Sequence, residues 1–210
     1  MRSKSNPTGR SFLEEARRKQ IVGCAIEILA EEGYGQATLA RIADHAGVSK
    51  SVIVYHFGGK DQVFEQVIVE VMTTATEVVR PQIEAESTAA GRLAAYLRSR
   101  VGFLATHRGH MLALFEIWMN LRDEHGQLRL SEADAKQTVD AIEQILRAGQ
   151  RSGEFGKFDP AVMAMAVRQA VDGVLLQLRF KPDLDLDTYA RELVALFDRA
   201  TRKQPSGRRK

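Results

Sequence analysis

Apolar residues recur three or four positions apart along most of the chain, a spacing that places them on one face of an α-helix. Segments with this pattern span about residues 12–32, 39–46, 50–56, 60–80, 87–106, 108–123, 131–151, 160–180 and 187–202. The sequence holds no run of alternating β-branched residues bounded by a hairpin turn. We therefore predict an all-α fold of about nine helices.

Capping residues and prolines mark the predicted ends of several helices. Thr38 and Ser49 precede the second and third segments, and their side chains are of the type that caps a helix. Asp159 before Pro160 is typical of a helix start, and Pro81 is predicted to end the fourth helix. The eighth segment is apolar around much of its circumference, which predicts burial on two sides. One side fits the core of the chain, and the other requires a partner.

Residues 38–57 predict two short helices joined by a turn. Ala43 allows the helices to approach closely, Gly47 permits a turn conformation that side chains resist, and Ile53 packs the second helix onto the first. This is a helix-turn-helix, whose second helix enters the major groove of DNA. The side chains predicted to face the base edges are those of Lys50, Ser51, Val52, Val54 and Tyr55. Lysine and serine hydrogen-bond bases or phosphates, and valine contacts a thymine methyl group.

The distribution of charge agrees with this interpretation. The net charge is +3, but residues 1–60 carry nine Lys and Arg against six Asp and Glu. Residues 61–198 carry fifteen against twenty-one, and residues 199–210 carry six against none. A basic start, an acidic body and a basic tail indicate one end that faces nucleic acid and a separate body. The alternative for the tail is that it only improves solubility.

The helix-turn-helix segment resembles the tetracycline repressor (TetR) family of transcriptional regulators. The matching residues are Thr38, Ile42-Ala43, Ala46-Gly47-Val48-Ser49-Lys50, Tyr55-His56-Phe57 and Lys60-Asp61. The resemblance implies that residues 50–55 read bases and that phosphates are contacted by Thr38, Tyr55, His56 and Lys60. Arg41 and Ser49 complete our candidate DNA-contacting set. The resemblance also implies a homodimer formed through the last two helices and a ligand pocket within the fourth to eighth helices.

Lys60 has a further argument from its position. A cation in the first turn of a helix opposes the helix macrodipole, and a DNA phosphate at the same place reverses the sign of that interaction. We therefore expect Lys60 to bind a phosphate, the alternative being a solvated lysine offset by Asp61.

The segment 111–122 gathers aromatic, methionine and polar residues, as ligand pockets do. Such a cluster also fits an ordinary core, and both interpretations stay open. The candidate effector-binding residues are Tyr96, Phe103, Met111, Phe115, Trp118, Met119, Arg122, Gln169 and Asp172.

Several classes of protein are not indicated. The chain of 210 residues is 44% hydrophobic and 27% charged, which is typical of a globular protein, and its single Cys24 excludes a disulfide scaffold. No phosphate-binding loop, nucleophile motif or paired carboxylate is recognised, so we expect no enzyme, cofactor or metal. His107 and His110 are expected to be ordinary surface or pocket histidines, and His45 and Cys24 are expected to be structural. No signal peptide or transmembrane run is visible, which predicts a cytoplasmic protein without a membrane partner.

The sequence thus predicts a dimeric, ligand-responsive DNA-binding regulator, released as a repressor from a pseudo-palindromic operator by a small molecule. The predicted divisions are a basic arm (1–11), a DNA-binding domain (12–59), a ligand-binding and dimerisation domain (60–202) and a basic tail (203–210). Two alternatives are a ligand-binding or interaction module and a protein that coats DNA without sequence preference. Salt dependence separates them, because non-specific DNA binding is almost wholly electrostatic.

Overall fold

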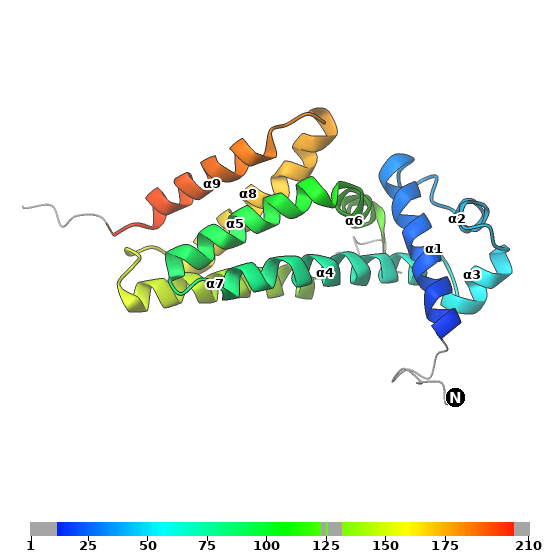
Figure 1. The fold of residues 1–210 in the computed structure, drawn as a ribbon, viewed down its shortest axis with the longest axis horizontal. Helices are drawn as coiled ribbons and strands as arrows, with labels where there is room; N and C mark the ends of the chain where they lie inside the picture. Colours follow the sequence, from blue (N-terminus) through cyan, green and yellow to red (C-terminus); the bar gives the residue numbers. More distant parts are fainter. Residues whose placement is uncertain (1–11, 123–124, 126–131, 204–210) are drawn as a thin grey trace, which may run out of the picture. The chain divides into compact units, whose positions relative to one another are not determined.

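A computed structural model of the chain describes residues 12–122, 125 and 132–203. Within these residues it has nine α-helices and no β-strand, which confirms the all-α prediction (Figure 1). The helices are α1 (Phe12–Glu31), α2 (Leu39–His45), α3 (Lys50–Phe57), α4 (Lys60–Glu84), α5 (Ala89–Thr106), α6 (Arg108–Asn120), α7 (Glu132–Ser152), α8 (Pro160–Phe180) and α9 (Leu186–Thr201). The predicted arm 1–11 lies outside the described residues, as do all but the first residue of the tail 203–210.

The described part of the chain packs into two compact units. Among the described residues, the N-terminal unit comprises 12–73, 109–122 and 125, and the C-terminal unit comprises 74–108 and 132–203. The helix α4 therefore begins in the first unit and ends in the second, while most of α6 belongs to the first. The sequence division at residue 59 rests on function rather than on packing, and it stays a prediction.

The core of the N-terminal unit is built from one apolar face of each of its helices. Figure 1 shows α1 beside the short pair α2 and α3. The buried side chains include Ile21, Ala25, Ile28 and Leu29 of α1, Ile42 of α2, Ile53 of α3, and Val63, Phe64, Val67 and Val71 of α4. Within each helix these side chains recur at the three- or four-residue spacing of one helical face.

In the C-terminal unit, α5 packs against α7, α8 and α9, and α7 packs against α8 (Figure 1). The core side chains from these helices include Leu97, Phe103, Ile142, Leu146, Val167, Val171, Val174 and Leu178. The helix α8 thus buries one face within its own unit. Its opposite face exposes Val162, Met165, Leu176 and Phe180. Only one of the two apolar faces predicted from the sequence is therefore buried within one chain.

The segment Pro160–Leu178 of α8 is long and apolar enough to cross a bilayer, judged by length and composition alone. A core helix meets the same criterion, and the buried face of α8 is that of a core helix.

Pro81 does not end the fourth helix as predicted, because α4 continues to Glu84. Proline lacks only its own N–H donor, and the turn that follows still closes: the Ala85 N–H donates to the Pro81 carbonyl at 3.0 Å. The Gln82 side-chain amide also donates to the Val78 carbonyl at 3.0 Å. A proline within one turn of the helix end is therefore tolerated here.

Two predicted caps are confirmed and one is wrong. The Thr38 hydroxyl accepts the Arg41 N–H at 3.1 Å, and the Asp159 carboxylate accepts the N–H groups of Ala161 and Val162. Ser49 occupies the cap position of α3 without a side-chain cap bond. Its hydroxyl lies 2.8 Å from the Ser51 hydroxyl, which competes for it. The fifth helix begins at Ala89 rather than near residue 87, because Thr88 caps it.

The C-terminal end of α9 is held by the loop that follows α7. The Gly156 N–H donates to the Thr201 carbonyl at 2.8 Å, and Phe155 and Arg202 form an isolated antiparallel bridge. The Phe155 ring lies directly over Gly149 of α7, where a Cβ atom would come within 2.2 Å of the ring. Only a glycine at position 149 leaves room for this packing.

Candidate nucleic-acid interface

The turn between α2 and α3 has the backbone conformation that the sequence predicts. Gly47 has φ +62°, in the left-handed region that favours glycine. The N–H groups of Gly47 and Val48 donate to the carbonyls of Asp44 and Ala43 at 3.1 and 2.9 Å, which closes the end of α2. The direction of α3 is therefore fixed by backbone bonds as well as by side-chain packing.

A rigid support holds α3 from behind. Ile53 and Phe57 are buried, and the Arg18 guanidinium of α1 lies 4.0 Å from the centroid of the Phe57 ring. Arg18 also donates to the His56 carbonyl, at the end of α3, and to the Gln66 side chain at 3.1 Å. One arginine thus joins α1 to α3 and α4.

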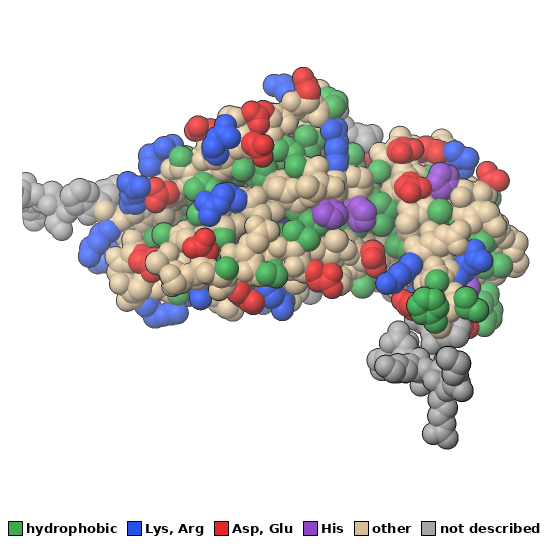
Figure 2. Space-filling view, viewed as in Figure 1, with side chains coloured by type: hydrophobic (Ala, Val, Ile, Leu, Met, Phe, Trp, Pro, Cys, Tyr) green, Lys and Arg blue, Asp and Glu red, His purple; other side chains and the backbone are tan. Residues whose placement is uncertain are grey.

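The opposite face of α3 is open to solvent. Tyr55 is 76% exposed and Val54 is 42% exposed, although both are large apolar or aromatic residues. Lys50 and Ser51 are also exposed, whereas Val52 and His56 are half-buried. Figure 2 shows hydrophobic side chains next to Lys and Arg side chains at the end of this unit where α1 begins. Among the predicted base-reading residues, Lys50, Val54 and Tyr55 are therefore an exposed group of mixed apolar and cationic character, which suits contacts with base edges.

Arg41 differs from the other predicted contacts because it is already paired. Its Nη2 lies 2.6 Å from a Glu32 oxygen, and its Nε lies 3.2 Å from both oxygens of the same carboxylate. The hydrogen bond from Arg41 lowers the pKa of Glu32, and the same bond raises the pKa of Arg41. Arg41 therefore reaches a phosphate only if it leaves Glu32 or shares its charge with it.

Lys60 is half-buried against aromatic rings at the start of α4. Its ammonium group lies 4.5 Å from the centroid of the Tyr34 ring and 5.1 Å from that of Phe64. Burial lowers the pKa of Lys60, and the nearby Asp61 opposes that shift. Thr38, at the start of α2, is exposed. Of the expected phosphate-contacting residues, Thr38 and Lys60 thus lie at the starts of two helices, whereas Tyr55 and His56 lie in the last turn of α3.

The candidate effector-binding residues are divided between the two units. Met111, Phe115, Trp118, Met119 and Arg122 belong to the N-terminal unit, and Tyr96, Phe103, Gln169 and Asp172 belong to the C-terminal unit. Tyr96, Phe103 and Met111 are buried, whereas Met119, Arg122 and Gln169 are exposed. Burial raises the pKa of Tyr96, and the nearby charge of Asp172 raises it further while that of Arg100 lowers it.

Comparison with known families settles the class of protein. The profile described as "Bacterial regulatory proteins, tetR family" matches residues 21–67, and "Tetracyclin repressor-like, C-terminal domain" matches residues 86–197, more than half of the chain. The chain belongs to the tetracycline repressor family. The members of this family are ligand-responsive DNA-binding transcriptional regulators, and most are repressors. The chain is therefore a DNA-binding transcriptional regulator.

Individual relatives agree with the family assignment. The fatty acid metabolism regulator protein of Bacillus subtilis is 30% identical over 136 residues, 64% of this chain and 69% of its own. Matches to two other curated regulators span 32% and 30% of their lengths. A tetR-family protein from Rhodococcus RHA1 has the same fold, with a TM-score of 0.75 and 22% identity over 90% of this chain and 98% of its own. The regulator AibR, solved in complex with isovaleryl coenzyme A and operator DNA, also has this fold. Its TM-score is 0.71, and it is 24% identical over 86% of this chain and 97% of its own.

In this tetracycline repressor family member, two arginines that are not among the predicted site residues lie beside Tyr96 and Asp172. Arg100 of α5 and Arg168 of α8 both pair with Asp172, and both are largely buried. The signal for them was present, because Arg100 follows Tyr96 by four positions and Arg168 precedes Asp172 by four. Charged residues at these positions continue the buried faces of their helices.

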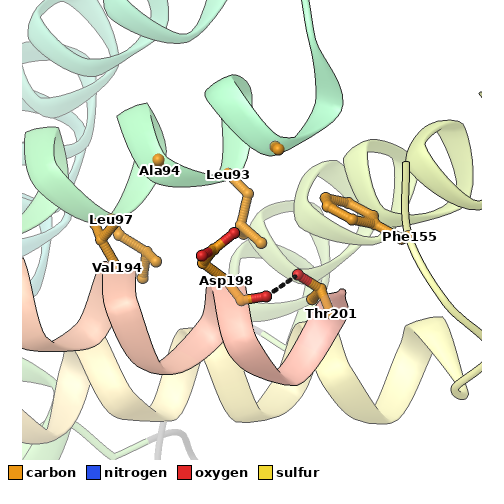
Figure 3. A pocket seen from close by; sticks show the side chains of 8 residues that line it. Leu93, Ala94, Leu97, Phe155, Val194, Asp198 and Thr201 are labelled. Carbon is orange, nitrogen blue, oxygen red and sulfur yellow. Dashed lines mark hydrogen bonds between the residues drawn. The ribbon is translucent and has the colours of Figure 1, made fainter. Parts of the chain in front are cut away.

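A pocket lies between α5 and α9 in the C-terminal unit of this family member (Figure 3). Its labelled lining residues are Leu93, Ala94, Leu97, Phe155, Val194, Asp198 and Thr201. The Thr201 hydroxyl donates to the Asp198 carbonyl at 3.4 Å, and the Asp198 carboxylate pairs with Arg202 at 2.5 Å. The polar groups of this pocket are therefore largely engaged, and most of its surface is apolar.

Three side chains of the N-terminal unit have ligand atoms close enough to hold a metal ion. The thiol of Cys24, the carboxylate of Glu27 and the imidazole of His45 lie within 4.8 Å of one another. Burial raises the pKa of the Cys24 thiol. The His45 Nε2 already lies 2.7 Å from a Glu27 oxygen, which joins α2 to α1. This contact fits the structural role that the sequence predicts for His45.

Proposed function

We propose that this regulator is a cytoplasmic, non-enzymatic homodimer that represses transcription by binding a pseudo-palindromic operator, and that a small effector releases it. The observation that carries the proposal is the exposed face of α3, where Lys50, Val54 and Tyr55 stand on a helix fixed from behind by Arg18 and Ile53. A large exposed aromatic side chain on a rigidly held helix favours a binding function over a purely structural one.

The proposed DNA contacts come from α2, α3 and the start of α4. We propose that residues 50–55 reach the base edges, and that phosphates are bound by Thr38, Arg41, Ser49, Tyr55, His56 and Lys60. For Lys60, a phosphate supplies the opposite charge that its position at the start of α4 lacks. In a dimer, two copies of α3 enter successive major grooves about 34–36 Å apart.

The dimer surface that we propose is formed by α8 and α9. The exposed apolar side chains of these helices are Val162, Met165, Leu176, Phe180 and Leu196. Their burial against a second copy accounts for the apolar face of α8 that its own unit leaves uncovered.

The effector that we propose is an acyl compound. One relative is named a fatty acid metabolism regulator, and the structure of AibR contains isovaleryl coenzyme A together with operator DNA. Release requires the effector to bind one dimer geometry more tightly than the geometry that fits DNA, because only differential affinity shifts such an equilibrium. We therefore expect the same compound to bind less tightly when the protein is on its operator.

Protection footprinting on DNA flanking the gene, at about 0.15 M salt, tests the proposal. The wild type is compared with Tyr55→Ala and with Val69→Ala, which removes an exposed apolar side chain of α4 in the same unit. We expect a short protected palindrome that Tyr55→Ala abolishes and Val69→Ala preserves. Protection that is uniform along the DNA, equally sensitive to salt on every sequence, and lost on deletion of residues 203–210 would instead indicate a non-specific coating protein.

A further inference from the structure

A cluster of charged and polar side chains is buried between α5 and α8 in the C-terminal unit. Tyr96 is 6% exposed, and the side chains of Arg100, Arg168 and Asp172 are 13%, 14% and 21% exposed. Charged groups are seldom buried to this degree unless they pair with one another or with a ligand. Each charged or polar group of this cluster is therefore expected to have a partner, either within the cluster or on a ligand.

Asp172 is held mainly by Arg168. The Arg168 Nε donates to an Asp172 oxygen at 2.9 Å, whereas Arg100 Nη2 lies 3.9 Å from the other oxygen. That second distance is too long for a hydrogen bond. The Arg100 Nε is buried and has no hydrogen-bond partner among the described residues. Arg100 thus keeps a buried positive charge and an unused donor.

The Tyr96 hydroxyl is also buried and has no acceptor for its proton among the described residues, because the neighbouring Arg100 guanidinium can only donate a hydrogen bond. Burial has the largest effect on the Tyr96 pKa and raises it, so the hydroxyl keeps its proton and acts as a donor. Two unused donors, one of them on a cation, therefore come from successive turns of α5. A purely structural role leaves both without an acceptor, which is costly in a protein interior.

The donors determine the chemistry of the missing acceptor. The edge of a guanidinium presents Nε and Nη in a plane that matches the two oxygens of a carboxylate, and a tyrosine hydroxyl adds a third donor. The neighbouring buried side chains are apolar, with Phe103 one turn along α5 and Val167 and Val171 beside Arg168 on α8. The environment thus suits an acid group attached to an apolar body.

We propose that Arg100 and Tyr96 bind the carboxylate of an apolar carboxylic acid, and that this free acid is the effector. The inference rests on the proposed ligand-responsive function and makes it more specific, because a coenzyme A thioester has no carboxylate at its acyl end. Arg168 and Asp172 act as positioning residues: Arg168 holds the Asp172 carboxylate, and that carboxylate faces the Arg100 guanidinium.

The test measures binding to the full-length protein by calorimetry and by thermal shift. The probes are hexanoate, decanoate and phenylacetate, each compared with its primary amide, together with decanoyl coenzyme A and inorganic phosphate. The variants are Arg100→Gln, Arg100→Lys and Tyr96→Phe. The matched control is Arg98→Gln, which removes a half-exposed arginine of the same helix whose Nη2 lies 3.9 Å from Glu86.

We expect at least one carboxylate to bind the wild type and Arg98→Gln equally, and its amide to bind neither. Arg100→Gln should weaken binding about thirtyfold or more, with partial recovery in Arg100→Lys because the charge returns without the planar fork. Tyr96→Phe should weaken binding several-fold while raising the melting temperature of the free protein, because it removes a buried hydroxyl without a partner. A purely structural tyrosine hydroxyl predicts no effect on binding.

Three results would overturn the inference: equal binding of acid and amide, undiminished binding by Arg100→Gln and Tyr96→Phe, or no binding of any carboxylate. Preference for decanoyl coenzyme A or phosphate would also overturn it. A second measurement separates this inference from the proposed function: fluorescence anisotropy of labelled operator DNA shows whether the compound releases the protein from it. A carboxylate that binds through Arg100 but leaves operator affinity unchanged contradicts the proposed release, whereas release by a compound without a carboxylate contradicts the inference alone.

Discussion

The ammonium group of Lys60 lies 4.5 Å from the centroid of the Tyr34 ring, at the start of α4. An aromatic face attracts a cation, so this contact partly offsets the unfavourable position of a lysine at a helix N-terminus. It also keeps the side chain in one place before DNA arrives. Lys60 is therefore held ready at a helix start where backbone N–H groups favour an anion.

Replacing Lys60 by methionine should weaken operator binding several-fold and reduce the slope of log affinity against log salt by about one, because one phosphate contact is lost. The loss should be similar on operator and random DNA, since a phosphate carries no sequence information. Fluorescence anisotropy over a range of salt concentrations measures both quantities. Lys136→Met, at an exposed position of α7, should leave the slope unchanged. An unchanged slope in Lys60→Met would show that Lys60 does not bind phosphate.

Replacing Arg18 by methionine should destabilise the N-terminal unit by about 1–3 kcal/mol, because the His56 carbonyl and the Phe57 ring lose their shared cationic partner. Urea unfolding measures the change. Arg17→Met is the control, because Arg17 is exposed and its guanidinium donates to the Gln20 side chain of the same helix. If both variants lose the same stability, the contact of Arg18 with the end of α3 is not what supports the helix.

Replacing Leu176 by glutamate should shift the protein from dimer to monomer and greatly weaken operator binding, because a charge would enter the proposed α8–α9 interface. Sedimentation velocity measures the oligomeric state, and circular dichroism verifies that the chain remains folded. Val69→Glu places the same charge on an exposed apolar position of α4 and should leave the dimer intact. A dimer that persists in Leu176→Glu would place the interface elsewhere.

Replacing Gly149 by alanine should destabilise the C-terminal unit by about 1–3 kcal/mol, because the new Cβ atom overlaps the Phe155 ring. Gly102→Ala is the matched control, since Gly102 is also within a helix but no atom lies within 4 Å of its added Cβ. That control should stabilise the protein by about 0.5–1 kcal/mol through helix propensity. Thermal unfolding of both variants measures the two changes in stability, which should have opposite signs. Equal effects would mean that the Phe155 ring moves away at little cost.

The helix-turn-helix was predictable because its signals are local. Thr38 caps a helix through atoms three residues away, and Gly47 marks a backbone conformation that other residues avoid. Ile53 follows from periodicity within a single short helix. These features need no knowledge of the rest of the chain.

The features that the sequence did not reveal depend on distant partners. The Arg41–Glu32 pair, the position of Lys60 over Tyr34, and the approach of Arg100 to Asp172 each join different elements. Ser49 shows a local failure, because its hydroxyl bonds to Ser51 instead of capping α3. Pro81 shows that a rule for helix ends gives way where the following turn still forms its bonds.

The loop after α7 restrains the C-terminal end of α9, a helix of the proposed dimer surface. The last turn of a helix ordinarily frays, and its backbone regains conformational freedom. In α9 this turn is held by the bond between the Gly156 N–H and the Thr201 carbonyl, so folding has already removed that freedom. A partner that docks on α9 therefore meets an ordered surface, and little backbone entropy is lost in the association itself.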